Sequence, residues 1–340
     1  MPMAGVGGVK VAPEYRGRGV GRALMNGLIP ELVTRGFPVS TLYPATAPLY
    51  RSLGWELAGG RYETTVPMQA LARLVAPDQA ATGQAAGGSG AGSSAVPAGL
   101  RRATAADAAV VADTVGQVYG SLGDCGPATF DLGSVADWLD DDNHLAYLAG
   151  DGFLSYRWAN VHESMRVEVL AAASASTARA FWQLLASHGT MADEVRACLA
   201  PDDPVSWLIA EPVAAVRQAW KWMLRLVDVP AAVAARGFPA GVEASVLLEV
   251  ADDQLPANTG RWRLQVSDGS GKIARVGPLA PAGDSSPVLR LGARGIAALY
   301  AGLPLTTLRR AGLAAGGDQA GDGALDSAFG CRPAFMVHDF

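Results

Sequence analysis

The sequence predicts a mixed α/β protein built from two or three domains. Short apolar runs with strand-like alternation alternate along the chain with longer stretches in which apolar residues recur at helical spacing. Half of the 340 residues are hydrophobic and only 17% are charged, so the chain can bury several cores. One stretch rich in glycine, alanine and serine, residues 77–99, cannot bury a core and predicts a flexible linker.

The first segment, residues 1–76, carries both periods. Residues 5–12 predict a strand, and helical spacing from Val20 onward predicts a helix that Gly36 ends. A strand over 38–44, a short helix over 46–55 and two strands around Gly59 and Gly60 are expected to follow.

Two further mixed segments follow the linker. In residues 100–221 we expect a helix over 100–120, strands over 144–159 and 165–173, and a helix around 176–189. In residues 222–340 we expect a hairpin over 244–276, helices over 292–302 and 305–313, and an apolar tail over 331–340.

Charge and composition exclude several functional classes. The net charge of −5 and the pI near 5.4 argue against a general nucleic-acid-binding protein, which needs a basic face. The three cysteines and four histidines are scattered, so neither a disulfide framework nor a metal site is expected. No apolar run reaches membrane-spanning length, and the first residues lack the apolar core of a signal peptide. We therefore expect a cytoplasmic protein with neither a nucleic acid nor a membrane as partner.

Glycine and positive charge gather between the first expected strand and the first expected helix. Residues 16–22 read Arg-Gly-Arg-Gly-Val-Gly-Arg. Backbone amides at a helix N-terminus attract an anion, glycines allow a diphosphate to approach closely, and arginines add charge. The stretch lacks the Lys-Ser/Thr ending of a P-loop, and its alternating glycines fit G-x-G-x-x-G poorly. A tight turn without a ligand is the structural alternative.

The pattern that the stretch does match is R-x-x-G-x-G. It resembles the acetyl-CoA loop of the GNAT acetyltransferase superfamily, and more specifically of its Eis (enhanced intracellular survival) family. Three further segments resemble that family in the same order: ATAPLYRSLGW at 45–55, MLRLVDVPAAVAAR at 223–236 and the terminal DF at 339–340. The resemblance thus spans nearly the whole chain.

The resemblance implies an architecture of three domains. A catalytic GNAT domain would occupy 1–76, a degenerate GNAT-like domain without a cofactor 100–221, and a sterol-carrier-like domain 222–340. Because residues 5–12 correspond to an interior strand of a GNAT domain, the first strands of that domain are expected to be missing from this chain. The family likeness also implies a homo-oligomer, in particular a hexamer.

The same resemblance assigns roles to residues of this sequence. Acetyl-CoA, as co-substrate, would be bound by Val9, Lys10, Val11, Arg16, Gly17, Arg18, Gly19, Val20, Gly21, Arg22, Ala45 and Thr46. By the same resemblance, Tyr50 matches the family's general acid. A phenol with a pKa near ~10 is protonated at neutral pH and can give its proton to the leaving thiolate. A packed aromatic residue on a short amphipathic helix is the structural alternative for Tyr50.

The family's general base is its C-terminal carboxylate. That role would fall to Phe340, whose apolar side chain would anchor the terminus, while Asp339 would pair with the ammonium group of the acceptor. The expected activity is acetyl transfer to a primary amine on a small molecule or peptide, such as an aminoglycoside, a lysine or a polyamine-like molecule. The alternative is a non-catalytic remnant, in which a truncated CoA-binding site is joined to a sterol-carrier-like fold.

Overall fold

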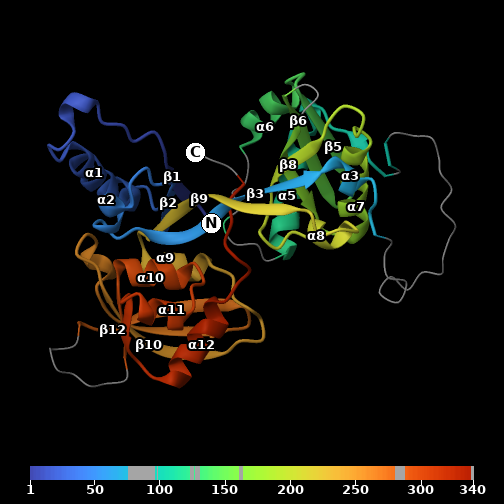
Figure 1. Cartoon of the computed structure of the whole chain (residues 1–340). Helices are drawn as coiled ribbons and strands as arrows, with labels where there is room; N and C mark the ends of the chain where they lie inside the picture. The colour runs from blue at the N-terminus through green and yellow to red at the C-terminus, as the bar shows by residue number, and fades with distance from the viewer. Residues whose placement is uncertain are drawn as a thin grey trace. The chain divides into compact units, whose positions relative to one another are not determined.

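The computed structural model describes residues 1–75, 96, 97, 99–122, 126, 131–160, 164–279 and 288–337. These residues form two compact units, both mixed α/β, as the sequence predicts (Figure 1). The first unit contains Met1–Gly60 and Trp220–Ala334, and the second contains Arg61–Ala219 with residues 335–337. The expected linker at 77–99 lies almost entirely outside the described residues.

A parallel strand–helix–strand element opens the first unit. Strand β2 (Val39–Leu42) pairs in parallel with β1 (Met3–Val6), and helix α1 (Val20–Thr34) connects them. On its other side β2 pairs antiparallel with β9 (Ala215–Leu226). Helix α1 buries its residues at positions 25, 29 and 32, whose spacing of four and three places them on one face.

The sequence predicts the extent of α1 correctly, including its end. Gly36 follows the helix with a φ of +71°, its amide bonds to Val33, and the next amide, of Phe37, bonds to Leu32. This pair of hydrogen bonds is a Schellman motif, which glycine favours because it adopts positive φ without strain. The expected helix over 46–55 is present as α2 (Ala47–Arg51).

Two strand predictions in this region are wrong. The strand expected over 5–12 ends at Val6, because the chain turns at Gly8, whose φ is +67°. The two strands expected around Gly59 and Gly60 are one continuous strand, β3 (Glu56–Pro67). Here the glycines allow close packing and do not form a turn. The Gly60 amide donates a hydrogen bond to the Ala334 carbonyl oxygen at 3.1 Å, and a Cβ at Gly59 would clash with the same oxygen.

A second sheet completes the first unit, with the order β12-β11-β10-β13-β14. Its strands are β10 (Ala244–Ala251), β11 (Gly260–Ser267), β12 (Ser270–Gly277), β13 (Leu289–Gly292) and β14 (Ala314–Gly316). The helices of this part are α9 (Val229–Ala235), α10 (Ala293–Tyr300), α11 (Leu305–Arg310) and α12 (Gln319–Phe329). The expected hairpin and the two expected helices, α10 and α11, are confirmed.

The second unit has the strand order β3-β8-β7-β6-β5-β4. Besides β3, these strands are β4 (Arg101–Arg102), β5 (His144–Ala149), β6 (Gly152–Asn160), β7 (Ser164–Ala172) and β8 (Glu194–Cys198). The helices are α3 (Met68–Leu71), α5 (Ala108–Leu122), α6 (Leu132–Leu139), α7 (Ala175–Ala186) and α8 (Val205–Leu208). Along β6, Phe153 packs with α5 and Leu154 with α7, so helices cover both faces of this sheet.

The helix expected over 100–120 starts later than predicted. Arg101 and Arg102 pair with β5 as strand β4, and Thr104 then caps a short 3₁₀ turn (Ala105–Asp107) through a capping box with Asp107. Helix α5 begins only at Ala108, because these residues are already used by the strand and the cap.

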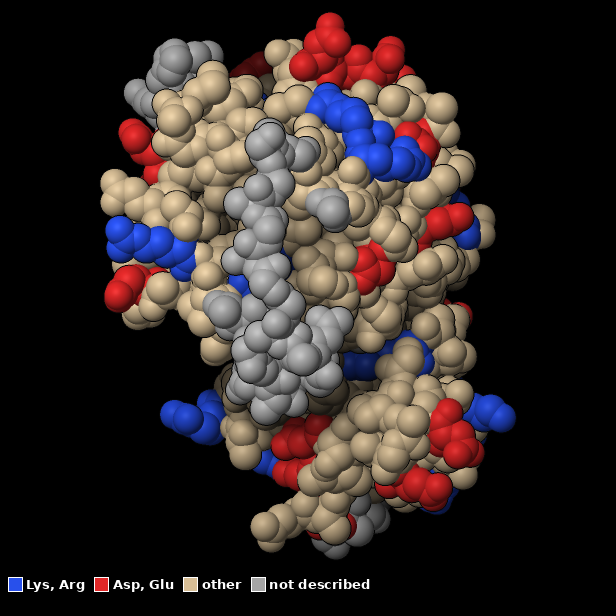
Figure 2. Space-filling model, turned by 90° about the vertical axis from the view of Figure 1, so that its right-hand side faces the viewer, with Lys and Arg blue, Asp and Glu red and all other residues tan. Residues whose placement is uncertain are grey.

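Charged side chains of both signs are interspersed on the face shown in Figure 2, in small separate groups. This distribution accompanies the modest net charge of −5.

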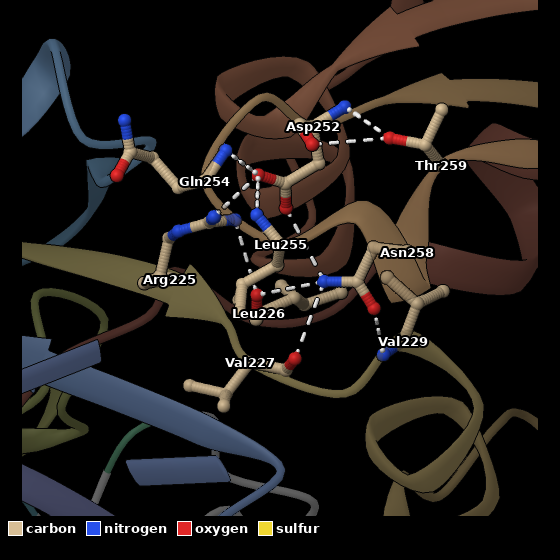
Figure 3. Close-up of polar contacts among 9 residues, drawn as sticks. All are labelled: Arg225, Leu226, Val227, Val229, Asp252, Gln254, Leu255, Asn258 and Thr259. Atoms are coloured by element: carbon tan, nitrogen blue, oxygen red, sulfur yellow. Dashed lines mark hydrogen bonds and ion pairs between the residues drawn. The ribbon is translucent and has the colours of Figure 1, made fainter. Parts of the chain in front are cut away.

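A buried ion pair lies inside the first unit (Figure 3). Arg225 of β9 donates to Asp252 at 2.7 Å, and both side chains are 1% exposed. Asp252 also accepts hydrogen bonds from the amides of Gln254 and Leu255 and from the side-chain amide of Asn258. An ion pair with this many hydrogen bonds tolerates burial, although the buried Arg225 Nε has no partner among the described residues; one member of the pair alone would be an uncompensated charge.

The buried pair therefore gives a stability prediction. Replacing Asp252 with asparagine leaves the Arg225 guanidinium buried without a counter-charge, so we expect a loss of about 3–5 kcal/mol in unfolding free energy. Urea denaturation followed by tryptophan fluorescence measures the loss. Glu31→Gln is the matched control, because its partner Arg35 and Glu31 itself are 65% and 51% exposed, and such pairs contribute at most about 1 kcal/mol. Equal effects of the two variants would contradict the assignment.

Candidate functional site

The loop that joins β1 to α1 contains most of the residues that the sequence singles out. It runs over residues 7–19 and includes a 3₁₀ turn, Pro13–Tyr15. Gly17 and Gly19 have φ values of +74° and +78°, which residues with a side chain rarely adopt. A Cβ at either position would meet no atom within 4 Å, so the backbone conformation, and not crowding, requires glycine there.

The start of α1 is open to an anion. Gly19 is the residue before the helix and has no side chain that could bond to the amides of the first turn. The first turn also lacks an acidic residue. Amides at such a helix start point outward, and the helix dipole favours negative charge near them.

Three arginines surround this helix start. Arg16, Arg18 and Arg22 are all exposed. The Arg16 side chain is held by a hydrogen bond from its Nε to the Val11 carbonyl at 3.1 Å, and the Arg18 guanidinium lies 5.8 Å from the centre of the Tyr15 ring. The loop can therefore present several cationic donors to a phosphate group.

The second unit repeats the strand–helix–strand element without this loop. Strand β7, helix α7 and strand β8 follow one another, and the two strands pair in parallel. Only two residues join β7 to α7, and Ser174 caps the helix by accepting a bond from the Thr177 amide at 3.2 Å. The Asp151 carboxylate accepts from the Thr177 hydroxyl. The start of α7 is thus covered by its own capping groups and a negative charge.

The structure brings several predicted site residues of the first unit together. A Cβ at Gly21 would lie 3.5 Å from Leu49 of α2 and 3.8 Å from Val11, so the loop, α1 and α2 pack closely there. Val9 packs against the same core that contains Tyr50. Both valines lie in the loop after β1 and not in a strand as predicted. Lys10, Val20, Ala45 and Thr46 are exposed, and Thr46 is the residue before α2.

Tyr50 is the last residue but one of α2 and is 6% exposed. It packs in a core with Met25 and Ile29 of α1 and with Trp55. Burial raises the pKa of the Tyr50 phenol above its ordinary value of 10.0. The phenol is therefore protonated throughout the neutral range, and it can donate a proton but not remove one.

The end of the sequence is partly described. Asp339 and Phe340, which the sequence analysis assigns to the acceptor site and to the general base, lie outside the described residues. The residues just before them are buried: Ala334 is 8% exposed, Phe335 4%, Met336 1% and Val337 4%. Phe335 and Val337 form a small apolar cluster with Cys198 and Ala200 in the second unit. The segment is thus packed against the protein up to Val337.

Sequence analysis missed a set of buried charges close to α2. Glu56, at the start of β3, is 3% exposed and accepts hydrogen bonds from Arg51 and Arg294. Burial by itself would raise the pKa of Glu56, but the Leu57 amide and the two guanidiniums outweigh it, so the pKa is lowered. Arg294 is 238 positions away from Glu56. A separation of that size leaves no spacing pattern in a single sequence.

Two other kinds of feature are absent from the described ranges. Within them, no group of three histidine, cysteine or acidic residues could hold a metal ion. Of the helices that the structure describes, none is long and apolar enough to cross a membrane.

Three family models match separate parts of the chain. An acetyltransferase (GNAT) domain matches residues 1–58, a second acetyltransferase (GNAT) domain matches 134–226, and a sterol carrier protein domain matches 229–337. The predicted fold class, two GNAT domains followed by a sterol-carrier-like domain, is confirmed. The exact boundaries expected at 76, 99 and 221 stay predictions.

Curated relatives agree with these models. N-acetyltransferase Eis of Mycobacterium tuberculosis is 29% identical over 290 residues, which are 79% of this chain and 65% of the relative. An uncharacterized N-acetyltransferase of Streptomyces griseus is 27% identical over 326 residues, covering 87% of this chain and 71% of the relative. The chain thus spans about two thirds of the length of the Eis proteins that it matches.

Solved structures cover the whole chain. A GCN5-related N-acetyltransferase from Kribbella flavida is 42% identical, with a TM-score of 0.85, and covers 100% of this chain and 80% of its own. A GCN5-related N-acetyltransferase from Anabaena variabilis is 26% identical, with a TM-score of 0.82 and coverages of 100% and 82%. Eis1 from Mycobacterium abscessus shares the fold, with a TM-score of 0.71. The identity to the Kribbella protein, together with the two GNAT models, shows that this chain belongs to the GCN5-related N-acetyltransferases and has an Eis-like architecture.

Proposed function

We propose that this chain transfers the acetyl group of acetyl-CoA to a primary amine on a small molecule or peptide, such as an aminoglycoside, a lysine or a polyamine-like compound. The observation that carries the proposal is the loop over residues 7–19, with two left-handed glycines and neighbouring arginines at an uncapped helix start. Membership of the GCN5-related family supports acetyl-CoA as the donor.

The diphosphate of acetyl-CoA suits the chemistry of this loop. The first turn of α1, after Gly19, contains no carboxylate. Its backbone amides can donate hydrogen bonds to a diphosphate, and so can the exposed guanidiniums of Arg16, Arg18 and Arg22. Backbone around Val9 and Val11 would accompany the pantetheine arm, and Ala45 and Thr46 would flank it. The short, self-capped start of α7 supports the proposal that the second GNAT domain binds no cofactor.

The reaction forms one bond and breaks one. The amine nitrogen bonds to the acetyl carbonyl carbon, and the carbon–sulfur bond of the thioester breaks. The amine loses a proton to a base, and the departing thiolate gains one. We assign the proton for the thiolate to Tyr50, because burial keeps its phenol protonated.

For the base we propose the terminal carboxylate of Phe340, with Asp339 binding the ammonium group of the acceptor. Ala334, six residues before Phe340, is buried and its carbonyl accepts from the Gly60 amide of the first unit. This contact holds the chain to the unit that contains Tyr50 shortly before its end, which supports the role. Burial near the acceptor would raise the low reference pKa of a terminal carboxyl, about 3.5, and make it a stronger base.

We further propose that the protein is cytoplasmic and acts as a homo-oligomer, as a hexamer by its likeness to the Eis family. Acceptor amines of this class are consistent with an acidic protein of net charge −5.

Gly19→Asp tests the donor site. An aspartate tolerates the left-handed conformation better than most residues, and its carboxylate would itself occupy the first amides of α1. We expect CoA to bind at least about tenfold more weakly in isothermal titration calorimetry. Gly27→Asp is the control, since it adds the same charge to the same helix about 12 Å further along and its Cβ meets nothing within 4 Å. Unchanged affinity in Gly19→Asp would refute the site.

Tyr50→Phe tests the acid. The ring and its packing remain, but the proton is lost, so we expect kcat to fall about 10²-fold while the affinity for CoA is unchanged. Because burial raises the pKa of Tyr50, deprotonation of this residue should not reduce the wild-type kcat below pH ~10. Steady-state assays of thiol release across pH 7–9.5 measure both effects. Tyr147→Phe in the second unit is the control, and a wild-type rate in Tyr50→Phe would exclude Tyr50 as the acid.

A single glycine added after Phe340 tests the base. The extension keeps every side chain but moves the terminal carboxylate by about 3.5 Å, a displacement that proton transfer does not tolerate. We expect turnover to fall about 10²-fold with unchanged binding of CoA. A glycine added before Met1 serves as the control. Turnover at the parental rate in the C-terminally extended protein would rule out the Phe340 carboxylate.

A further inference from the structure

Helix α2, which carries Tyr50, is too short to hold its own orientation. It spans only five residues, Ala47–Arg51, and isolated helices of that length are unstable in water. Its orientation must therefore come from the groups against which its ends are fixed. Several of those groups, among them Ala293 and Arg294 of α10, belong to the sterol-carrier-like segment, residues 229–337, within the same compact unit.

The first fixed point is the carboxylate of Glu56. One oxygen accepts hydrogen bonds from Arg51 Nε at 3.0 Å and Nη2 at 2.9 Å, and from the Leu57 amide at 2.9 Å. The other oxygen accepts from Arg294 Nε at 2.6 Å. Arg51 is the last residue of α2, and Arg294 lies in the first turn of α10. A single buried carboxylate thus links the residue after Tyr50 to the sterol-carrier-like segment.

The second fixed point is Gly54, three residues after α2. Its φ is +93°, and a Cβ on it would lie 2.7 Å from the Arg225 guanidinium and 2.9 Å from Ala293 Cβ. The chain leaving α2 therefore packs directly against both the buried guanidinium and the first residue of α10. Any side chain at position 54 would push these elements apart.

The position of that guanidinium is set by the network in Figure 3. Asp252 accepts from Arg225 at 2.7 Å and from the Leu255 amide at 3.0 Å. The Leu255 side chain, 8% exposed, belongs to the same core as Tyr50 and Trp55. The sterol-carrier-like segment thus contacts the surroundings of Tyr50 through apolar packing as well as through charge.

We propose that the sterol-carrier-like segment positions Tyr50 for proton transfer. Arg294 of this segment acts as a positioning residue through Glu56. Asp252 of the segment holds Arg225 of β9, which acts as a second positioning residue through Gly54. This inference rests on the proposed function, because it gives the segment a part in the same acetyl transfer. Proton transfer requires heavy atoms to stay within hydrogen-bond distance, and a displacement of about 1 Å reduces rates strongly. Fixing both the last residue of α2 and the chain that follows it limits such displacement.

Arg294→Gln is the central test, because this side chain is 40% exposed and its removal leaves Glu56 paired with Arg51. We expect kcat to fall at least about tenfold with little change in the KM for acetyl-CoA or in the calorimetric Kd of CoA. Amide hydrogen exchange, read by mass spectrometry on peptides that cover 47–57, should become faster. Arg294→Lys keeps the charge and should restore part of both losses.

Arg309→Gln is the matched control. It removes an ion pair with Asp322 inside the same segment, where the two side chains are 32% and 23% exposed. If Arg294→Gln acted through a general loss of stability, Arg309→Gln would show the same effects. If Arg294→Gln acts through the position of α2, Arg309→Gln would not show them. We expect wild-type kcat and wild-type exchange over 47–57 in this control.

The outcomes separate this inference from the proposed function. Wild-type exchange over 47–57 together with wild-type kcat in Arg294→Gln would overturn the positioning role and leave the acetyl transfer intact. If the unaltered protein released no thiol with any amine, the proposed function would fail. The exchange comparison of Arg294→Gln with Arg309→Gln would then still decide whether α2 is held by the segment.

Discussion

The buried pair of Arg225 and Asp252 is the constraint on which the rest of the first unit depends. Both side chains are 1% exposed, so each requires the other. Arg225 belongs to β9, next to β2, and Asp252 follows β10 of the second sheet. Because Gly54 packs directly on the guanidinium, the place of the chain that follows α2 is also fixed by this pair. Within the first unit, this ion pair therefore links the GNAT part, through Arg225, to the sterol-carrier-like part, through Asp252. Replacing either residue alone would leave the other as an unpaired buried charge.

The two units show how one supersecondary element acquires different chemistry. Both contain a parallel strand–helix–strand element, β1-α1-β2 and β7-α7-β8. In the first, a loop with left-handed Gly17 and Gly19 leaves the helix amides open. In the second, a two-residue turn with Ser174 covers them. The difference lies in the connection and not in the sheet, as expected when binding functions are carried by loops on a shared scaffold.

Local signals in the sequence predicted a large part of the fold. The extent of α1 and its end at Gly36 follow from helical spacing and from a glycine at the stop, and both are local features. The loop between β1 and α1 was recognisable for the same reason. The strand expected over 5–12 was wrong, because the strand-like valines at 6, 9 and 11 do not reveal that Gly8 turns the chain. A turn was expected at Gly59 and Gly60, but these glycines instead let the backbone of Ala334 approach β3 closely. Ala334 is remote in sequence, so no local signal reveals this contact.

The candidate site could be predicted only where its residues form a contiguous motif. Tyr50 and the arginines of the loop lie within such motifs. Glu56 and Arg294, and likewise Arg225 and Asp252, become neighbours only through tertiary packing. A lone buried charge looks like any surface charge in a single sequence, because its burial depends on a partner elsewhere in the chain. The positions that orient the site are therefore those that the sequence reveals least.

Incubating the protein with acetyl-CoA and a panel of primary amines tests the proposed acetyl transfer most directly. Released thiol and acetylated product would be quantified together, the product by mass spectrometry. We expect at least one amine to gain a single acetyl group in a one-to-one ratio with released thiol, and no product to form without the protein. Binding of CoA without acetylation of any amine in the panel would contradict the proposed transfer and would favour a non-catalytic CoA-binding role.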